Sequence, residues 1–171
     1  MPIHWRPLTT LDLPAVEAIA AEVHPHFPED TAVFAERQRL YPEGTRLLEV
    51  HGKPAGYILS HPWRFGAIPA LNSRLGHIPA DADTYYIHDL ALLPTARGSG
   101  AAAMVVTDMI DHALRAGLGS ATLVAVNNSL PFWTHQGFAP VERPELSDKL
   151  RSYEEAACYM VRRLARPSRS D

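Results

Sequence analysis

A stretch of small residues in the middle of the chain has the composition of an anion-binding turn. Residues 94–103, PTARGSGAAA, contain one arginine, two glycines and four alanines, and they follow an apolar run. Between a strand and a helix, such a segment exposes helix-starting backbone N–H groups, which lack intrahelical acceptors and carry partial positive charge. Small side chains leave those amides open to a phosphate group. The segment therefore indicates a pyrophosphate site, although a glycine turn that only lets the helix pack closely on the sheet also fits.

Two known phosphate-binding motifs do not account for this segment. Gly98, Gly100 and Ala103 match the G-x-G-x-x-A pattern of dinucleotide-binding domains. That pattern opens directly after its strand and requires an acidic residue about 20 positions later, whereas here residues 94–96 intervene and the next apolar run ends at Asn127. No G-x-x-x-x-G-K-[ST] motif occurs. An oxidoreductase is therefore disfavoured, and a Walker phosphate loop is excluded.

Hydrophobic periodicity predicts the elements that position the segment. We expect strands at residues 3–7, 47–50, 55–60, 84–93, 121–126 and 157–164, and helices at 12–24, 30–41, from 101 to about 117, and from about 128 to 137. The strand, helix and strand spanning residues 84–126 form a crossover, which makes the two strands parallel. The sequence thus predicts an α/β protein with one mixed sheet and about four helices. We expect a single domain over residues 1–165 and a tail over 166–171, with the irregular stretch 62–83 as a candidate substrate lid.

Composition narrows the class of protein. The 171 residues carry a formal net charge of −3 and only one cysteine, Cys158, which we expect to be a buried small side chain. A basic surface for nucleic acid is not indicated, because the arginine cluster is terminal (Arg162, Arg163, Arg166 and Arg169). The first residues lack a cationic segment followed by a long apolar run, and no run of about 18 apolar residues occurs, so secretion and membrane spanning are disfavoured. We expect a cytoplasmic protein that binds neither membrane nor nucleic acid and holds no metal, since His24 and His26 lack a third ligand.

Residues 88–106, HDLALLPTARGSGAAAMVV, resemble the acetyl-CoA site of the GNAT superfamily of N-acetyltransferases. The family signature [Q/R]-x-x-G-x-[G/A] is matched by Arg97, Gly100 and Ala102, with a proline three residues before the arginine. Residues 131–138, PFWTHQGF, resemble a later element of the family, except that Trp133 stands where many members carry a tyrosine. The resemblance implies a GNAT-like acyl-CoA N-acyltransferase fold, with six or seven strands splayed between the strands at 84–93 and 121–126.

The resemblance also implies how acetyl-CoA is held. The pantetheine arm pairs with the exposed edge of the strand at 84–93, as an added strand would. The amide of Leu92 donates to the thioester carbonyl, and Asn127, or failing it Asn128, contacts the pantetheine region. The cofactor-binding residues implied are Leu90, Leu92, Leu93, Arg97, Gly98, Ser99, Gly100, Ala101, Ala102, Asn127, Phe132 and Trp133.

The general base is expected on the same strand. Because side chains alternate along a strand, counting back from Leu92 places Leu90, His88 and Tyr86 on one face. His88 matches a histidine that arylalkylamine N-acetyltransferases carry on the corresponding strand, and imidazole exchanges protons near neutral pH. A structural role for His88 also fits, and a bulge would shift the alternation and favour Asp89. An indole cannot act as an acid, so the thiolate takes its proton from water, Tyr86 or His135, or leaves unassisted.

These observations predict an acetyl-CoA-dependent N-acetyltransferase. A primary amine of a small molecule or peptide attacks the thioester directly in a ternary complex, with catalytic roles for His88, Leu92 and Tyr86. The alternative is a noncatalytic acyl-CoA sensor or interaction module on the same fold, which the missing tyrosine favours. The sequence does not identify the acceptor amine, and a homodimer is compatible with it.

Overall fold

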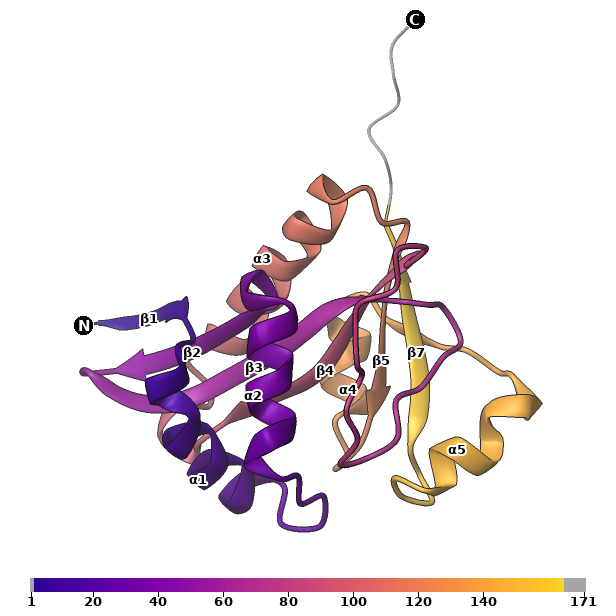
Figure 1. Ribbon diagram of the computed structural model, residues 1–171. Helices are drawn as coiled ribbons and strands as arrows, with labels where there is room; N and C mark the ends of the chain where they lie inside the picture. Colours follow the sequence, from indigo (N-terminus) through magenta and orange to yellow (C-terminus); the bar gives the residue numbers. More distant parts are fainter. Residues whose placement is uncertain (1, 165–171) are drawn as a thin grey trace, which may run out of the picture.

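The computed structural model describes residues 2–164 and forms one mixed sheet (Figure 1). Its seven strands lie in the order β1-β2-β3-β4-β5-β7-β6. They are β1 (Ile3–Pro7), β2 (Thr45–Val50), β3 (Lys53–Trp63), β4 (Thr84–Leu92), β5 (Ser120–Ala125), β6 (Ala139–Pro140) and β7 (Cys158–Arg163). β4 and β5 are parallel, and the other neighbouring pairs are antiparallel. The mixed sheet expected from the sequence is confirmed.

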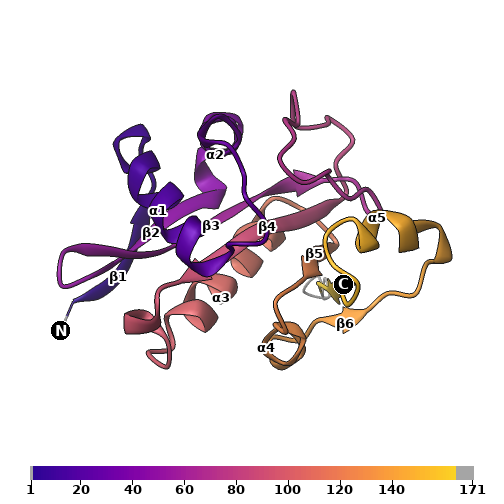
Figure 2. The same cartoon turned by 90° about the horizontal axis from the view of Figure 1, so that it is seen from below.

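Helices cover both faces of the sheet. They are α1 (Leu13–Val23), α2 (Thr31–Leu40), α3 (Ala101–Arg115), α4 (Leu130–His135) and α5 (Ser147–Arg151), with short 3-10 turns at Thr10–Asp12, Pro42–Gly44, Pro94–Ala96 and Pro144–Leu146. Figure 2 shows α1 and α2 on one face and α3 and α4 on the other. Each face buries its own apolar cluster, centred on Val106 and Met109 of α3 and on Val16 and Ile19 of α1. These side chains belong to the helical periodicity that predicts both helices.

The structure extends some of the expected elements and adds two others. β3 continues past the expected end at residue 60 to Trp63. The short strand β6 and the helix α5 fall in a region for which the sequence predicts no helix. The predicted tail at 166–171, with Arg166 and Arg169, lies outside the described residues.

The irregular segment 64–83 lies on the α2 side of the sheet (Figure 2). It is held there by buried side chains of α2. The Glu36 carboxylate accepts hydrogen bonds from the backbone N–H groups of Leu75 (2.6 Å) and Gly76 (3.2 Å), and Arg37 donates to the carbonyl of Ser73. At the other end of the segment, the Tyr153 hydroxyl donates to the carbonyl of Pro69. The function of this segment as a lid stays a prediction.

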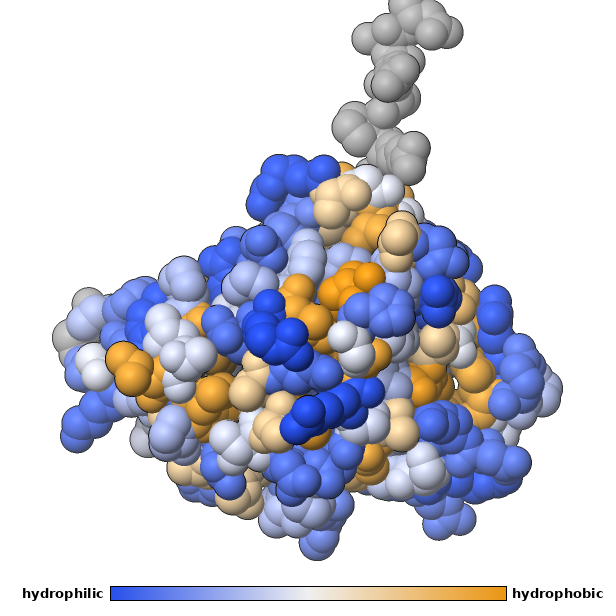
Figure 3. Space-filling view, in the orientation of Figure 1, coloured by the Kyte–Doolittle hydropathy of each residue, from blue (hydrophilic) through white to orange (hydrophobic). Residues whose placement is uncertain are grey.

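Polar side chains dominate the visible surface. Figure 3 shows them over most of the face that carries α1 and α2, with apolar side chains in small separate patches. Among residues 2–164, the exposed large apolar side chains are Leu11, Met104 and Leu130, and they come from different parts of the chain. Within residues 2–164, no helix is both long and apolar enough to span a bilayer. A homodimer, with which the sequence is compatible, is neither supported nor opposed by this surface.

Candidate active site

The central parallel strands separate part of the way along their length. β4 and β5 pair only at Tyr85 with Ala121, Tyr86 with Thr122 and Ile87 with Leu123. β4 then runs on to Leu92 while remaining paired with β3 on its other edge. The splayed sheet expected between these two strands is confirmed, and one edge of β4 faces the opening.

The backbone amides of Leu90 and Leu92 point into this opening. In the antiparallel pair of β3 and β4, Ala91 lies opposite Tyr57 and Leu92 lies opposite Gly56. The amide of Leu93 donates to the carbonyl of Ala55 at 2.8 Å, so it faces β3. Because successive amides of a strand point to opposite sides, the amide of Leu92 faces away from β3, as does that of Leu90. Both donors are available to a ligand in the opening.

Two glycines with left-handed backbone shape the turn into α3. Gly98 has a φ of 78° and Gly100 a φ of 84°, a region that side-chain-bearing residues rarely occupy. A Cβ added at either position would meet nothing within 4 Å. Close packing of these glycines on the sheet, which the sequence left open, is therefore wrong. Ser99 Oγ accepts from the amide of Ala101 at 3.2 Å and donates to the carbonyl of Ala96 at 2.5 Å, which fixes the first turn of the helix.

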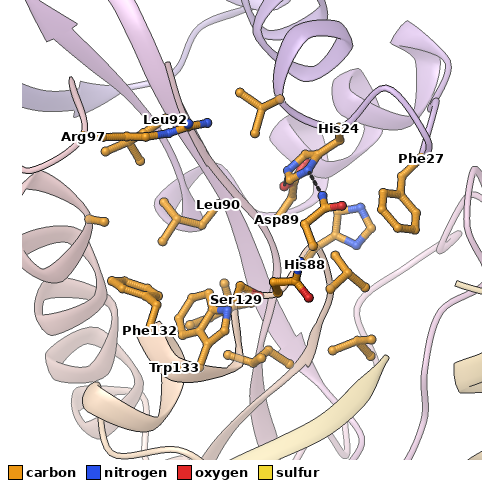
Figure 4. A pocket seen from close by; sticks show the side chains of 18 of the residues that line it. His24, Phe27, His88, Asp89, Leu90, Leu92, Arg97, Ser129, Phe132 and Trp133 are labelled. Carbon is orange, nitrogen blue, oxygen red and sulfur yellow. Dashed lines mark hydrogen bonds and ion pairs between the residues drawn. The ribbon is translucent and has the colours of Figure 1, made fainter. Parts of the chain in front are cut away.

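A cavity of about 940 Å³ fills the opening between the strands. In Figure 4, Arg97 and Phe27 lie toward opposite ends of it, and Phe132 and Trp133 lie on the side away from His24. The expected site residues that line it are Tyr86, His88, Leu90, Leu92, Arg97, Gly98, Gly100, Ala101, Ala102, Asn127, Phe132 and Trp133. Leu93 instead packs with the cluster under α1, and Ser99 accepts a hydrogen bond from the amide of Ala101, the first residue of α3. The structure thus gathers most, but not all, of the residues that the sequence singled out.

A β-bulge changes the faces of β4. Leu59 pairs with Asp89 while its neighbour Ser60 pairs with Ile87, so His88 is an extra residue in β4. As a result, Leu90 packs with the α3 cluster, whereas Tyr86 faces His61 with ring centroids 5.7 Å apart. The expectation that Tyr86, His88, Leu90 and Leu92 share one face is wrong. The strand instead contains the bulge that the sequence left open as an alternative, and this bulge reorients Asp89.

His88 is held by a buried carboxylate. Its Nε2 lies 2.9 Å from Oε1 of Glu29, and the two side chains are only 4% and 7% exposed. Its Nδ1 is buried without a hydrogen-bond partner among residues 2–164. Burial acts to raise the pKa of Glu29, but the charge and hydrogen bond of His88 outweigh it, and the pKa is lowered. His88 and Glu29 therefore form a buried hydrogen-bonded pair at the edge of the cavity.

A second histidine, at the end of α1, lies in a more open position. His24 Nε2 is 2.8 Å from Oδ1 of Asp89, and the Tyr57 hydroxyl donates to Oδ2 of the same carboxylate at 2.5 Å. On its other side, His24 Nδ1 is 2.9 Å from Nδ2 of Asn127. The sequence weighed His24 only as a metal ligand, and the described part of the chain contains no cluster of three or more metal-binding side chains. The one signal that pointed here was the possible bulge at Asp89.

Aromatic rings close the opposite wall of the cavity. Trp133 is 7% exposed and packs edge-on against Phe132 and Phe138, with centroids 4.9 and 5.5 Å apart. Tyr86 is also buried, and burial raises the pKa of its phenol well above the ordinary value. Tyr86 therefore keeps its proton at neutral pH, and its expected catalytic role stays a prediction.

The chain matches the model of the Acetyltransferase (GNAT) family over residues 7–138. Since this match covers more than half of the sequence, the chain belongs to that family and is an acyltransferase by class. No curated protein sequence matches it.

Solved structures share the fold at low sequence identity. Ard1 from Thermoplasma volcanium is 16% identical, with a TM-score of 0.73 over 97% of this chain and 100% of its own. The ribosomal-protein-S18-alanine N-acetyltransferase from Escherichia coli is 17% identical, with a TM-score of 0.68 over 98% and 97% of the two chains. Naa50 from Arabidopsis thaliana, in complex with the bisubstrate analogue CoA-Ac-MVNAL, is 16% identical, with a TM-score of 0.70 over 94% and 97%. These similarities establish the fold.

Proposed function

We propose that the protein transfers an acetyl group from acetyl-CoA to the primary amine of a small molecule or peptide, by direct attack in a ternary complex. The observation that carries this proposal is the end of β4–β5 pairing at Ile87 and Leu123, beyond which the free edge of β4 runs along a cavity to the start of α3. The cavity joins three features: a strand edge with free amides, a helix start and an apolar wall. Membership of the acetyltransferase family and the ligand named for Naa50 support it.

The residues present fit acetyl-CoA. The strand edge at Leu90 and Leu92 suits the amide groups of a pantetheine arm. The glycine turn at Gly98 and Gly100 opens onto the first amides of α3, which suit a pyrophosphate, and Arg97 adds positive charge at the same end (Figure 4). When bound, acetyl-CoA supplies an activated thioester.

The chain's own groups then orient and stabilise the reacting atoms. The amide of Leu92 donates to the thioester carbonyl and stabilises the negative charge that develops on its oxygen. Phe132 and Trp133 pack against the acyl and pantetheine groups and exclude water. Asn127 supplies an amide at the mouth of the cavity. Tyr86 donates a hydrogen bond, since its phenol holds its proton, and solvent protonates the departing sulfur.

A histidine removes the proton of the amine. His88 and His24 both line the cavity, each paired with a carboxylate. His88 was expected from the sequence to be this base, and that assignment stays a prediction.

Release of free thiol from acetyl-CoA, measured with a panel of amines, tests the proposed function. The panel contains polyamines, arylalkylamines, amino acids and peptides with free amino termini, and calorimetry measures CoA binding in parallel. We expect CoA to bind and at least one amine class to be acetylated. The alternative, an acyl-CoA sensor, is favoured by Trp133 in place of a tyrosine. Tight CoA binding without turnover on any amine would support the sensor and contradict the enzyme.

A further inference from the structure

We propose that His24, rather than His88, is the general base of the reaction, with Asp89 and Tyr57 as positioning residues that hold its ring. This inference rests on the proposed function, because it concerns the amine that attacks the thioester. Three elements contribute: the end of α1 carries His24, β4 carries Asp89 and β3 carries Tyr57. None of these residues is near another in the sequence.

The hydrogen bonds fix the protonation of the ring. Asp89 is an acceptor when ionised, so the Nε2 atom at 2.8 Å from Oδ1 must carry a hydrogen. In the neutral ring the lone pair then lies on Nδ1. The Tyr57 hydroxyl occupies the second oxygen of Asp89, so the carboxylate cannot turn away from His24. A carboxylate that orients an imidazole whose other nitrogen faces the substrate is the arrangement of a general base.

The Nδ1 nitrogen of His24 lies on the cavity side of the ring. Both His24 and Asn127 line it, and the Asn127 amide group approaches Nδ1 to 2.9 Å. Asn127 is exposed and comes from the loop after β5, so an N–H donor already occupies the position that the amine nitrogen needs. The His24 side chain is 15% exposed, compared with 4% for His88. In His88, by contrast, Nδ1 is buried and Nε2 is hydrogen-bonded to Glu29.

The electrostatic surroundings make His24 basic. Burial acts to lower its pKa, but the hydrogen bond and charge of Asp89, together with the charge of Glu29, outweigh burial and raise the pKa. His88 also interacts with Asp89. Other titratable groups around the cavity near His24 are Glu22 and His26 on its own segment, Tyr57 on β3, and Glu154, which accepts from the backbone amide of Asn127.

The proposed step balances in atoms and charge. As the amine nitrogen bonds to the thioester carbon, its proton passes to Nδ1 of His24. The C–S bond breaks, and its electron pair leaves with the sulfur, which takes a proton from solvent. The imidazolium returns its proton to solvent, so His24 ends unchanged.

Kinetics on the best amine of the panel test the base. We expect His24→Ala to lower kcat/KM by about 100-fold or more, while the affinity for CoA changes by less than about twofold, because other residues hold the cofactor. His51→Asn is the matched control, since His51 lies in the β2–β3 turn with a φ of 53°, which asparagine tolerates. We expect His88→Ala to retain the acidic limb of the pH profile. Wild-type kcat/KM in His24→Ala, or loss of that limb only in His88→Ala, would overturn the proposal.

Titration of the His24 imidazole by NMR, in protein without acetyl-CoA, tests the positioning residues. Asp89→Asn removes the charge that raises the pKa of His24, so we expect the titration and the acidic limb of kcat/KM to move together to lower pH. Tyr57→Phe removes one hydrogen bond and leaves the charge, so it should fold even if Asp89→Asn does not, and it should shift both curves less. If His24 were purely structural, the NMR titration would still move with Asp89→Asn, but the acidic limb of kcat/KM would stay where it is. If neither substitution changed the titration of His24, the positioning role of Asp89 and Tyr57 would be refuted. Inactivity of the wild type on every amine would refute only the proposed function.

Discussion

Gly100 offers the sharpest test of the anion site, because its surroundings allow one charge to be added without a change of shape. Its φ is 84°, and a Cβ there would meet no other atom within 4 Å. Asparagine and aspartate have nearly equal size, tolerate this backbone and can both cap a helix. Gly100→Asp and Gly100→Asn therefore differ by one negative charge at the start of α3. Two like charges about 6 Å apart, at an effective dielectric constant of about 20, repel by about 3 kcal/mol, so we predict about 100-fold weaker CoA binding for the aspartate variant.

Isothermal titration calorimetry of both variants with CoA measures this ratio. It should shrink when the salt concentration is raised from about 0.05 to about 0.5 M, because salt screens charges that lie near solvent. Thermal unfolding without CoA serves as the control, and the two variants should melt within a few degrees of each other. Equal affinities of the two variants at low salt would show that no phosphate binds at this turn.

Three further substitutions test the fold and the strand edge. Asp12→Asn should lower the free energy of unfolding at pH 7 by roughly 1–2 kcal/mol, because the hydrogen bond from Arg6 lowers the pKa of Asp12 to about 2. Urea titrations should show this difference between wild type and variant above about pH 4, and the difference should disappear toward pH 2. Burial lowers the pKa of His61 to about 3, so below about pH 6.5 the unfolded chain binds a proton that the folded chain does not. The free energy of unfolding therefore decreases as the pH is lowered, and His61→Phe should make this decrease shallower. Leu92→Pro deletes the backbone N–H that faces the opening rather than β3, so it should weaken CoA binding about 10-fold. Leu92→Ala keeps this N–H and should leave the affinity for CoA unchanged, and calorimetry measures both.

The sequence predicts the elements well wherever periodicity is strong, and it is wrong where partners decide the boundary. β3 illustrates the second case, because Pro62 indicates the end of a strand but lies within it. β2 pairs with β3 only as far as Leu59, so beyond that point one edge of β3 has no strand beside it. A proline is tolerated at such an edge because its missing N–H has no partner to lose. No local pattern reveals which edge is free.

The two halves of the candidate site differ in the same way. The cofactor half is local: Leu92, Arg97 and Gly100 lie within one strand, turn and helix start, and their spacing is visible in the sequence. The proton-transfer half joins His24 and Asp89, which are 65 positions apart. Their meeting depends on how α1 packs against the sheet, which periodicity does not determine.

The extra residue in β4 connects these two halves. In an unbulged strand, Asp89 would share the face of Tyr85 and Ile87, among the apolar side chains under α3, where a carboxylate would lack partners. The bulge at His88 instead places Leu90 in that cluster and turns Asp89 toward His24. Since side-chain face and amide direction alternate together along a strand, the same shift aims the amides of Leu90 and Leu92 into the opening. One inserted residue thus sets both the donors for the cofactor and the carboxylate that orients His24.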